Sequence, residues 1–214
     1  MLDLLERIGE LPAEIWLVPP VLILGAMAAV GIFFRRRRLR RYRAIADRTG
    51  LSVRPKIFSS SEVAGTYRGR PLVMSLITPQ KETWFRRYWT VVKVEFKNPE
   101  LLRLRMWRQD AIDRLFLATG WSEVEIGDET FDRRFIIHSD EPRVVTRLFQ
   151  DGRLRDIIIR SDIDSVELLS AHMRVFYGRE ERNPDHADLL FTAATMLADA
   201  IDAITPDYRP EIIR

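Results

Sequence analysis

An uncharged stretch of 20 residues, Ile15 to Phe34, lies directly before the most basic part of the chain. As a helix that rises about 1.5 Å per residue, this stretch measures about 30 Å, the thickness of a bilayer's hydrocarbon core. Seven of the nine residues from 35 to 43 are arginine. This abrupt change is typical of a helix that crosses a membrane and ends among the headgroups. The pattern therefore predicts a single-pass membrane anchor.

The charges on the two sides of this stretch predict its orientation. Residues 1–14 carry four acidic residues and one arginine, whereas residues 35–43 carry no acid. Because arginine-rich flanks stay in the cytoplasm, we predict that the N-terminus lies outside the bacterial inner membrane and the main domain inside. A cleaved signal peptide is not expected, since it begins with a basic segment. The side chains predicted to contact the headgroups of anionic lipids are Arg35, Arg36, Arg37, Arg38, Arg40 and Arg41.

The predicted anchor also carries small side chains at a spacing that lets two helices approach closely. Gly25 and Ala29 are four residues apart, and Ala28 lies beside them. We predict that these three residues pack against a helix of another integral membrane protein. In residues 1–14, four leucine and isoleucine side chains fall near one face, which favours a short interfacial helix on the outer side.

The prolines and glycines of this region predict where the helix begins and ends. Pro19 and Pro20 fit the first turn of a helix, so regular helix is expected to start there. Gly50 is expected to end it after Thr49. The predicted organisation is an outer-side tail at 1–14, a transmembrane helix with an arginine-rich cytoplasmic extension at 15–49, and a cytoplasmic α+β domain at 50–214.

The domain itself reads as an antiparallel sheet covered by helices on one side, the α+β class. Val92, Val94 and Phe96 alternate with polar residues, as expected of a strand with one buried face. Arg68, Gly69 and Arg70 separate two β-rich runs, which predicts a hairpin. Strands are predicted at 62–67, 71–77, 90–96, 101–107 and 131–139, a hairpin at 165–178, and helices at 110–119, 142–150, 151–158 and 184–205.

No catalytic or cofactor motif is present in the sequence. The chain has no cysteine, and its three histidines, His138, His172 and His186, lie in separate predicted elements without the spacing of metal ligands. We interpret all three as structural. The acidic run that starts at Asp162 resembles a calcium loop, but Glu167 replaces its turn glycine and Met173 its last ligand. We therefore predict no metal, no cofactor and no enzymatic activity.

The distribution of charge and one cluster of aromatic residues indicate which kinds of partner to expect. The net charge of +3 is smaller than the seven positive charges of residues 35–43, so basic charge is not spread over the domain, and a nucleic-acid partner is not expected. Tryptophan, tyrosine and arginine dominate protein interfaces and also suit the headgroup layer. We therefore predict contact with a partner protein or the membrane surface at Trp84, Phe85, Arg86, Arg87, Tyr88 and Trp89; the alternative is that half of them belong to the core of the next strand.

The stretch IGDETFDRRFIIHSDEPRVVTRLF, with GTYRGRPL upstream, resembles a loosely defined group of uncharacterised bacterial membrane-anchored proteins. The resemblance covers about residues 60 to 150 and implies the fold and the anchor, without an activity. Read as one strand, the motif places Phe131, Arg133, Phe135 and Ile137 on one face, so Arg133 is expected to pair inward with an acid. The matching positions are Gly127, Asp128, Phe131, Asp132, Arg133, Arg134 and Phe135.

These observations favour a non-catalytic accessory subunit that stabilises a larger integral membrane complex. Energy-transducing assemblies, photosynthetic reaction centres with their antennae or respiratory complexes, are the machines in which one-span subunits of this layout are expected. A membrane-tethered enzyme is one alternative, and it requires a concave polar pocket. A signalling module that binds a lipid or a peptide is the other.

Overall fold

The computed structural model of the protein describes residues 13–56, 61–77, 89–97, 102–109, 122–168 and 172–204. Within these ranges, the side chains of residues 13–21 and of Ser122 are not described. The chain divides into two compact units, of which the first ends at Arg40 and the second begins at Arg41. Residues 1–12 of the tail predicted at 1–14 lie outside the described residues.

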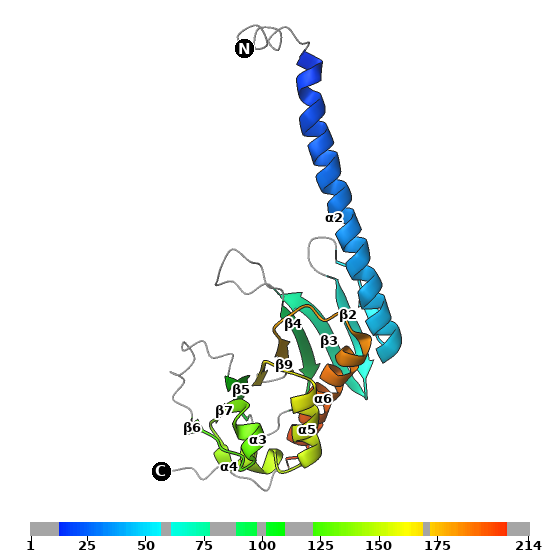
Figure 1. Ribbon diagram of the computed structural model, residues 1–214. Helices are drawn as coiled ribbons and strands as arrows, with labels where there is room; N and C mark the ends of the chain where they lie inside the picture. Colours follow the sequence, from blue (N-terminus) through cyan, green and yellow to red (C-terminus); the bar gives the residue numbers. More distant parts are fainter. Residues whose placement is uncertain are drawn as a thin grey trace, which may run out of the picture. The chain divides into compact units, whose positions relative to one another are not determined.

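Helix α2 runs from Ala13 to Thr49 and carries the arginine run within it (Figure 1). Its end before Gly50 confirms the predicted stop. Its start is earlier than predicted, because Pro19 and Pro20 lie inside the helix and not in its first turn. Each proline removes one backbone donor from the helix.

The predicted membrane span is described only in part. The side chains of residues 15–21, at its beginning, lie outside the described residues. Among the residues that the structure does describe, no helix offers a stretch that is both long enough and apolar enough to cross a membrane.

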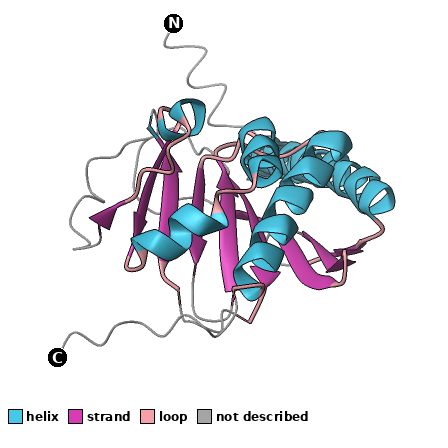
Figure 2. Ribbon diagram, turned by 90° about the horizontal axis from the view of Figure 1, so that it is seen from below, coloured by secondary structure: helices cyan, strands magenta, loops and turns pink. Residues whose placement is uncertain are grey.

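The second unit is built on an antiparallel sheet, as predicted, and belongs to the α+β class (Figures 1 and 2). In the described part of the chain the strand order is β1-β2-β3-β4-β9-β8-β5-β7-β6. The hairpin β8–β9 therefore lies between two groups of earlier strands. The bounds are β1 Ser52–Arg54, β2 Glu62–Tyr67, β3 Arg70–Ile77, β4 Trp89–Glu95, β5 Leu104–Arg108, β6 Ser122–Glu123, β7 Phe135–Ser139, β8 Ser165–Leu168 and β9 His172–Tyr177.

One face of this sheet carries the core. Because directly opposite residues of neighbouring strands share a face, the register defines a continuous row across seven strands. Each side chain in the row is at most 1% exposed. The row consists of Val63, Met74, Val92, Val175, Val166, Met106 and Ile137.

In the described part of the second unit, helices α3, α4, α5 and α6 pack with this sheet or with one another (Figure 2). Helix α6 packs on β4, β9 and α5, while α3 and α4 pack on β7. Asn183 caps α6 by accepting a hydrogen bond from the Asp185 amide, and Pro184 is its first residue, as predicted. The bounds are α3 Glu129–Asp132, α4 Pro142–Leu148, α5 Gly152–Arg160 and α6 Pro184–Asp202.

Two predicted elements need comment. The strand predicted at 131–139 is wrong in its first half, because Glu129–Asp132 form α3 and β7 begins only at Phe135. Asp128 caps that helix and so favours the helical turn over an extended chain. The helix predicted at 110–119 lies outside the described residues.

Candidate functional site

The arginines predicted to meet lipid headgroups differ in their surroundings. Arg35, Arg36, Arg37 and Arg40 are exposed, and Arg38 is half-buried. Arg41 begins the second unit, where its guanidinium lies 3.8 Å from the carboxylate of Glu180. Arg41 therefore has a partner within the domain.

The predicted helix-packing residues Gly25, Ala28 and Ala29 are all exposed. A Cβ added to Gly25 meets no atom of the described chain within 4 Å. The neighbouring large side chains are exposed too, with Leu22 at 67% and Met27 at 65%. This part of α2 thus presents an apolar surface to its surroundings; its other large exposed members are Ile23, Leu24, Val30, Ile32, Phe33 and Phe34.

Of the predicted aromatic and arginine contact cluster, residues 84–88 lie outside the described residues. Trp89 is described, and it begins β4 opposite Ile77 of β3. Its ring packs edge-to-face on Phe176 of β9, with ring centroids 6.3 Å apart. Trp89 is therefore a residue of the strand that follows the cluster.

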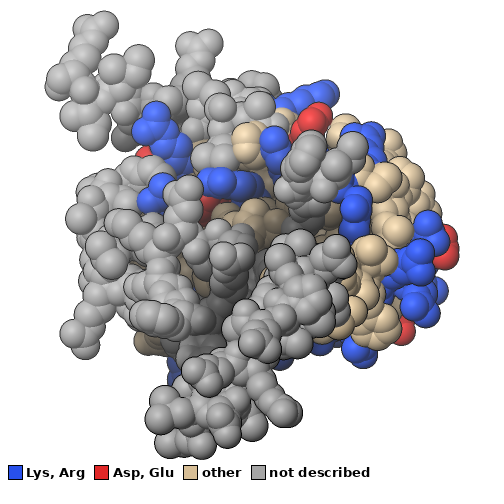
Figure 3. Space-filling model, turned by 90° about the horizontal axis from the view of Figure 1, so that it is seen from above, with Lys and Arg blue, Asp and Glu red and all other residues tan. Residues whose placement is uncertain are grey.

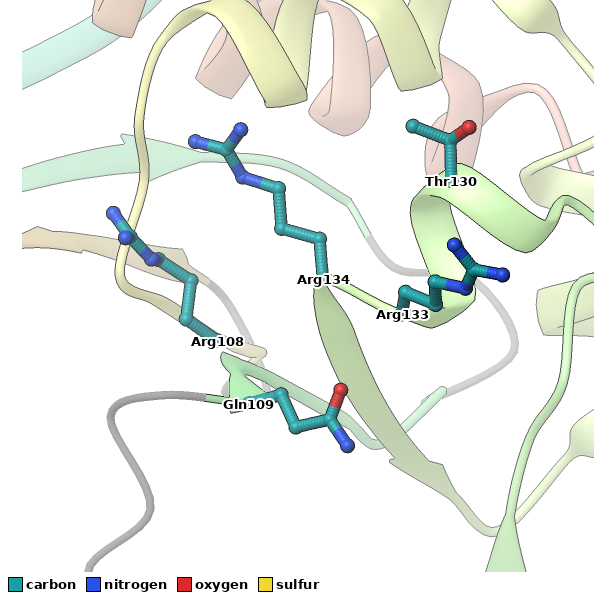
Figure 4. Close-up of a pocket in the computed structure, with 5 residues that line it drawn as sticks. All are labelled: Arg108, Gln109, Thr130, Arg133 and Arg134. Atoms are coloured by element: carbon teal, nitrogen blue, oxygen red, sulfur yellow. The ribbon is translucent and has the colours of Figure 1, made fainter.

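The second unit contains an open pocket of about 530 Å³ with no acidic side chain in its lining. We call it the arginine pocket, and it is lined by Arg108, Gln109, Thr130, Arg133 and Arg134. Figure 4 shows these side chains on three elements that meet: the end of β5, the short helix α3, and the turn that leads into β7. The pocket joins residues far apart in the sequence, because β5 and β7 are neighbours in the sheet.

The turn before β7 explains why Arg133 and Arg134 lie at the pocket. Gly127 adopts φ +83, a conformation that glycine enters without strain. Asp128 then accepts hydrogen bonds from the amides of Thr130 and Phe131, and caps α3. The helix ends within one turn, and the two arginines follow directly.

Two further interactions stabilise this turn. The carboxylate of Asp132 accepts hydrogen bonds from the amides of Ile126 and Gly127, each at 2.9 Å. Phe131 is fully buried against Phe135 and Phe149, with ring centroids 5.0 and 5.3 Å away. The conspicuous sequence motif is therefore first of all a turn that holds its arginines in place.

A carboxylate on the segment after α5 positions two of the pocket arginines. Asp162 Oδ1 accepts hydrogen bonds from Arg108, at 2.7 Å, and from Arg134, at 2.8 Å. Asp162 Oδ2 accepts one from Arg179, at 3.4 Å. The backbone supports the same junction, because the Gln109 amide donates to the Arg134 carbonyl at 2.9 Å.

Arg133 has a different environment from the one predicted. It does not point inward to a buried acid; its side chain is 76% exposed and pairs with Glu129 one helical turn earlier. The prediction failed because it read residues 131–134 as a strand. Arg134 is the more buried of the two, and its Nε–H has no hydrogen-bond partner in the described part of the protein.

Two shifted carboxyl pKa values accompany this network. Burial raises the pKa of Asp164, although the Gly178 amide and Arg108 favour its charged form. The amide of Phe131 and the guanidinium of Arg155 lower the pKa of Asp128. Among the described residues, Arg108, Arg134 and Arg179 pair with Asp162, and Arg108 also lies 3.6 Å from Asp164.

The three histidines lie apart, as predicted from their separate elements. His138 is buried beside Trp107, with ring centroids 4.9 Å apart, and His172 begins β9. His186 lies on α6 and hydrogen-bonds to Glu181, which is 3% exposed. Within the described ranges, no group of three or more histidine or acidic side chains is arranged to hold a metal ion.

Basic side chains are also a visible feature of the described surface. Figure 3 shows Lys and Arg at several places on one face of the molecule, with acidic side chains in smaller areas between them. Sequence reasoning singled out Arg133 and Arg134 but missed Arg108, Gln109 and Thr130. No local signal identifies those three, because Arg108 and the Asp162 that holds it are 54 residues apart.

No protein-family model and no curated protein matches the chain. One solved structure that is similar is titled "crystal structure of the mycobacterial trehalose monomycolate transport factor A, TtfA". The TM-score is 0.54 at 13% sequence identity, over 79% of this chain and 97% of the other. At this identity the likeness concerns the fold, and it spans almost all of the mycobacterial protein's structure.

Proposed function

We propose that the chain is a non-catalytic accessory subunit, anchored in the bacterial inner membrane, that stabilises a larger integral membrane complex. In this proposal the first unit supplies the anchor and one contact with the complex. The second unit lies on the cytoplasmic side and supplies another contact. The arginines between residues 35 and 41 meet the headgroups of anionic lipids.

The observation that carries this proposal is the apolar surface of α2. Leu22, Ile23 and Leu24 are consecutive and 67%, 59% and 66% exposed. Because successive helical residues point about 100° apart, such a run covers more than one side of the helix. In water this exposed area is unfavourable, at about 25 cal/mol per Å². Lipid chains or the helices of a partner would remove it from water.

The similar solved structure lends support of a second kind. Its title names a transport factor, which is a component that serves a transport process. A role beside other membrane components is in keeping with that description. Transport assemblies therefore join photosynthetic and respiratory complexes as candidates for the partner.

Copurification tests the proposal. The full-length chain, tagged at its C-terminus, is isolated from native membranes in a mild detergent, and its companions are identified by mass and stoichiometry. We expect integral membrane proteins at a fixed ratio. Recovery of the chain as a lone monomer in several mild detergents would contradict the accessory role.

A pair of substitutions separates anchoring from partner contact. Replacing Gly25 and Ala29 together by leucine keeps the helix apolar but fills the surface that a second helix would approach. We expect membrane association to be unchanged and recovery of the partner to fall at least about tenfold, as a loss of about 1.4 kcal/mol would produce. Val30→Leu, an apolar change without loss of a small residue, is the matched control and should leave both unchanged.

Two experiments test the anchor: a charged substitution within the predicted span, and the protease accessibility of tags at the two termini. Ala28→Arg costs about 2.5 to 3.5 kcal/mol at the centre of a membrane helix, so it should release the chain from carbonate-washed membranes. In intact spheroplasts an added protease should remove an N-terminal tag and spare a C-terminal one. A C-terminal tag that is cleaved as fast as the N-terminal tag would overturn the predicted orientation.

A further inference from the structure

We propose that the arginine pocket binds a phosphate group, carried either by a soluble molecule or by a lipid headgroup. This inference rests on the second unit alone and does not depend on the accessory role. It concerns Arg108, Gln109, Thr130, Arg133 and Arg134, which line the pocket.

The lining is rich in hydrogen-bond donors of the kind that phosphate accepts. Each arginine offers five N–H donors in a planar fork, and Gln109 and Thr130 add an amide and a hydroxyl. The donors come from three elements, β5, α3 and the turn before β7. Figure 4 shows the side chains of Arg108 and Arg134 pointing to one side and that of Arg133 to the other. Phosphate has three or four acceptor oxygens and can use several directions at once, whereas a carboxylate has two.

The arginines are already held in place, which lowers the entropy cost of binding. Asp162 accepts one hydrogen bond each from Arg108 and Arg134, at 2.7 and 2.8 Å. Asp162 itself adopts φ +50, an uncommon conformation for a residue other than glycine. Asp162 follows Ser161, the C-cap of α5, and a left-handed residue at this position is a common way for a helix to end.

The remaining donor capacity favours an anion in addition to Asp162. Arg134 Nε–H is buried and has no partner in the described residues, which is unfavourable unless a ligand satisfies it. Within the described part of the chain, the ion-pair partner of Arg133 is the exposed Glu129, and a pair of this kind contributes little. Its guanidinium therefore turns toward a ligand at small cost.

The composition of the lining points the same way. It contains three arginines and no acidic side chain. Asp162, which positions Arg108 and Arg134, is not among the lining residues. A pocket of about 530 Å³ holds a phosphate group with room for the molecule that carries it.

The first experiment measures binding of inorganic phosphate by the full-length protein in a non-ionic detergent. Equilibrium dialysis with radiolabelled phosphate gives the affinity and stoichiometry, at constant ionic strength set with chloride. Arg133→Gln removes a guanidinium and its positive charge without touching a buried contact, and should weaken binding about tenfold or more. Arg153→Gln removes an exposed positive charge of α5 outside the pocket lining and should change the affinity less than about twofold.

The second arm distinguishes the source of the phosphate. The same variants are tested for binding to phosphatidylcholine nanodiscs with and without phosphatidic acid, in a background in which Arg35, Arg36 and Arg37 are glutamine. Sensitivity of phosphatidic acid binding to Arg133→Gln, without binding of inorganic phosphate, assigns the site to a lipid headgroup. Sensitivity of inorganic phosphate binding assigns it to a soluble phosphate. If Arg133→Gln and Arg134→Gln both leave binding of the two probes unchanged, the proposal is wrong.

Discussion

Large apolar side chains are exposed in one part of helix α2 and buried in another part of the same helix. In the first unit, Leu22 and Phe34 of α2 are 67% and 61% exposed. In the second unit, Tyr42 and Ile45 of the same helix are 1% and 0% exposed, within the core of the domain. Both parts belong to one continuous helix, so the difference in exposure comes from what packs against each part and not from the backbone. The domain buries its own apolar side chains, whereas those of the first unit are exposed; in the proposed function, lipid or a partner covers them.

The largest expected difference between the two environments comes from replacing a phenylalanine by alanine once in the domain and once in the exposed part of α2. Phe131→Ala removes a fully buried ring that packs on Phe135 and Phe149, and should lower the free energy of unfolding by about 3 to 5 kcal/mol. Phe34→Ala should leave the unfolding of the domain within about 0.5 kcal/mol of the wild type. Its effect should appear in the partition of the chain into membranes.

Urea denaturation in detergent, followed by near-ultraviolet circular dichroism, measures the first effect. Flotation with lipid vesicles measures the second. Equal loss of domain stability in the two variants would show that Phe34 also belongs to a protein core. The comparison between the two parts of α2 would then fail.

A second prediction concerns how the stability of the domain depends on pH through the His186–Glu181 pair. The hydrogen bond with Glu181 raises the pKa of His186, against the opposing effect of burial; Asp162 and the Ser161 carbonyl also raise it, and the Tyr177 ring packs on the imidazole. A raised pKa in the folded state means that the pair stabilises the domain below the unfolded value of 6.5. That stability is lost as pH rises through the folded pKa.

We therefore expect the melting temperature of the wild type to fall as pH rises above 6.5, and His186→Gln to lack this fall. His172→Gln is the matched control. Burial and the charges of Lys93 and Arg174 lower the pKa of His172, so that residue affects stability in the opposite direction as pH falls. A His186→Gln variant that keeps the full pH dependence would refute the assignment.

The smallest effect is expected at the pocket. Arg133 and Glu129 are 76% and 78% exposed, so Arg133→Gln should change the free energy of unfolding by less than about 0.5 kcal/mol. Arg134→Gln should cost about 1 kcal/mol or more, because Asp162 loses a charged donor. Thermal melts of both variants measure the difference. Arg133→Gln and Arg134→Gln of equal stability would mean that Asp162 does not position Arg134.

Much of the fold could be predicted because its signals are local. The hairpin predicted around Arg68, Gly69 and Arg70 is present between β2 and β3; Arg68 and Gly69, at φ +48 and +83, form its turn, and Arg70 already belongs to β3. Asn183 and Pro184 begin α6 as predicted. Capping and turn geometry depend on residues a few positions apart, so the sequence alone contains them.

The motif before β7 shows where local reading fails. The alternation of Phe131, Arg133 and Phe135 is that of a strand, but the cap at Asp128 and the buried Phe131 favour a single helical turn. The arginine pocket could not be predicted from the sequence for a related reason. Arg108, Arg134 and Asp162 meet only through the order of the strands and the path of α5, and pairwise charges in a sequence do not specify that order.

The place of the last hairpin in the sheet has a consequence for how the domain forms during synthesis. Strands β1 to β4 make one antiparallel group and β5 to β7 another, and each group has an open edge until β8 and β9 join them. Residues 165–177 must therefore leave the ribosome before the two groups become one sheet. Pairing of strands so far apart in the chain is slow, and exposed edges in the meantime invite association with other chains. The order of the strands thus keeps two sheet edges of the nascent domain exposed until residues 165–177 have been made.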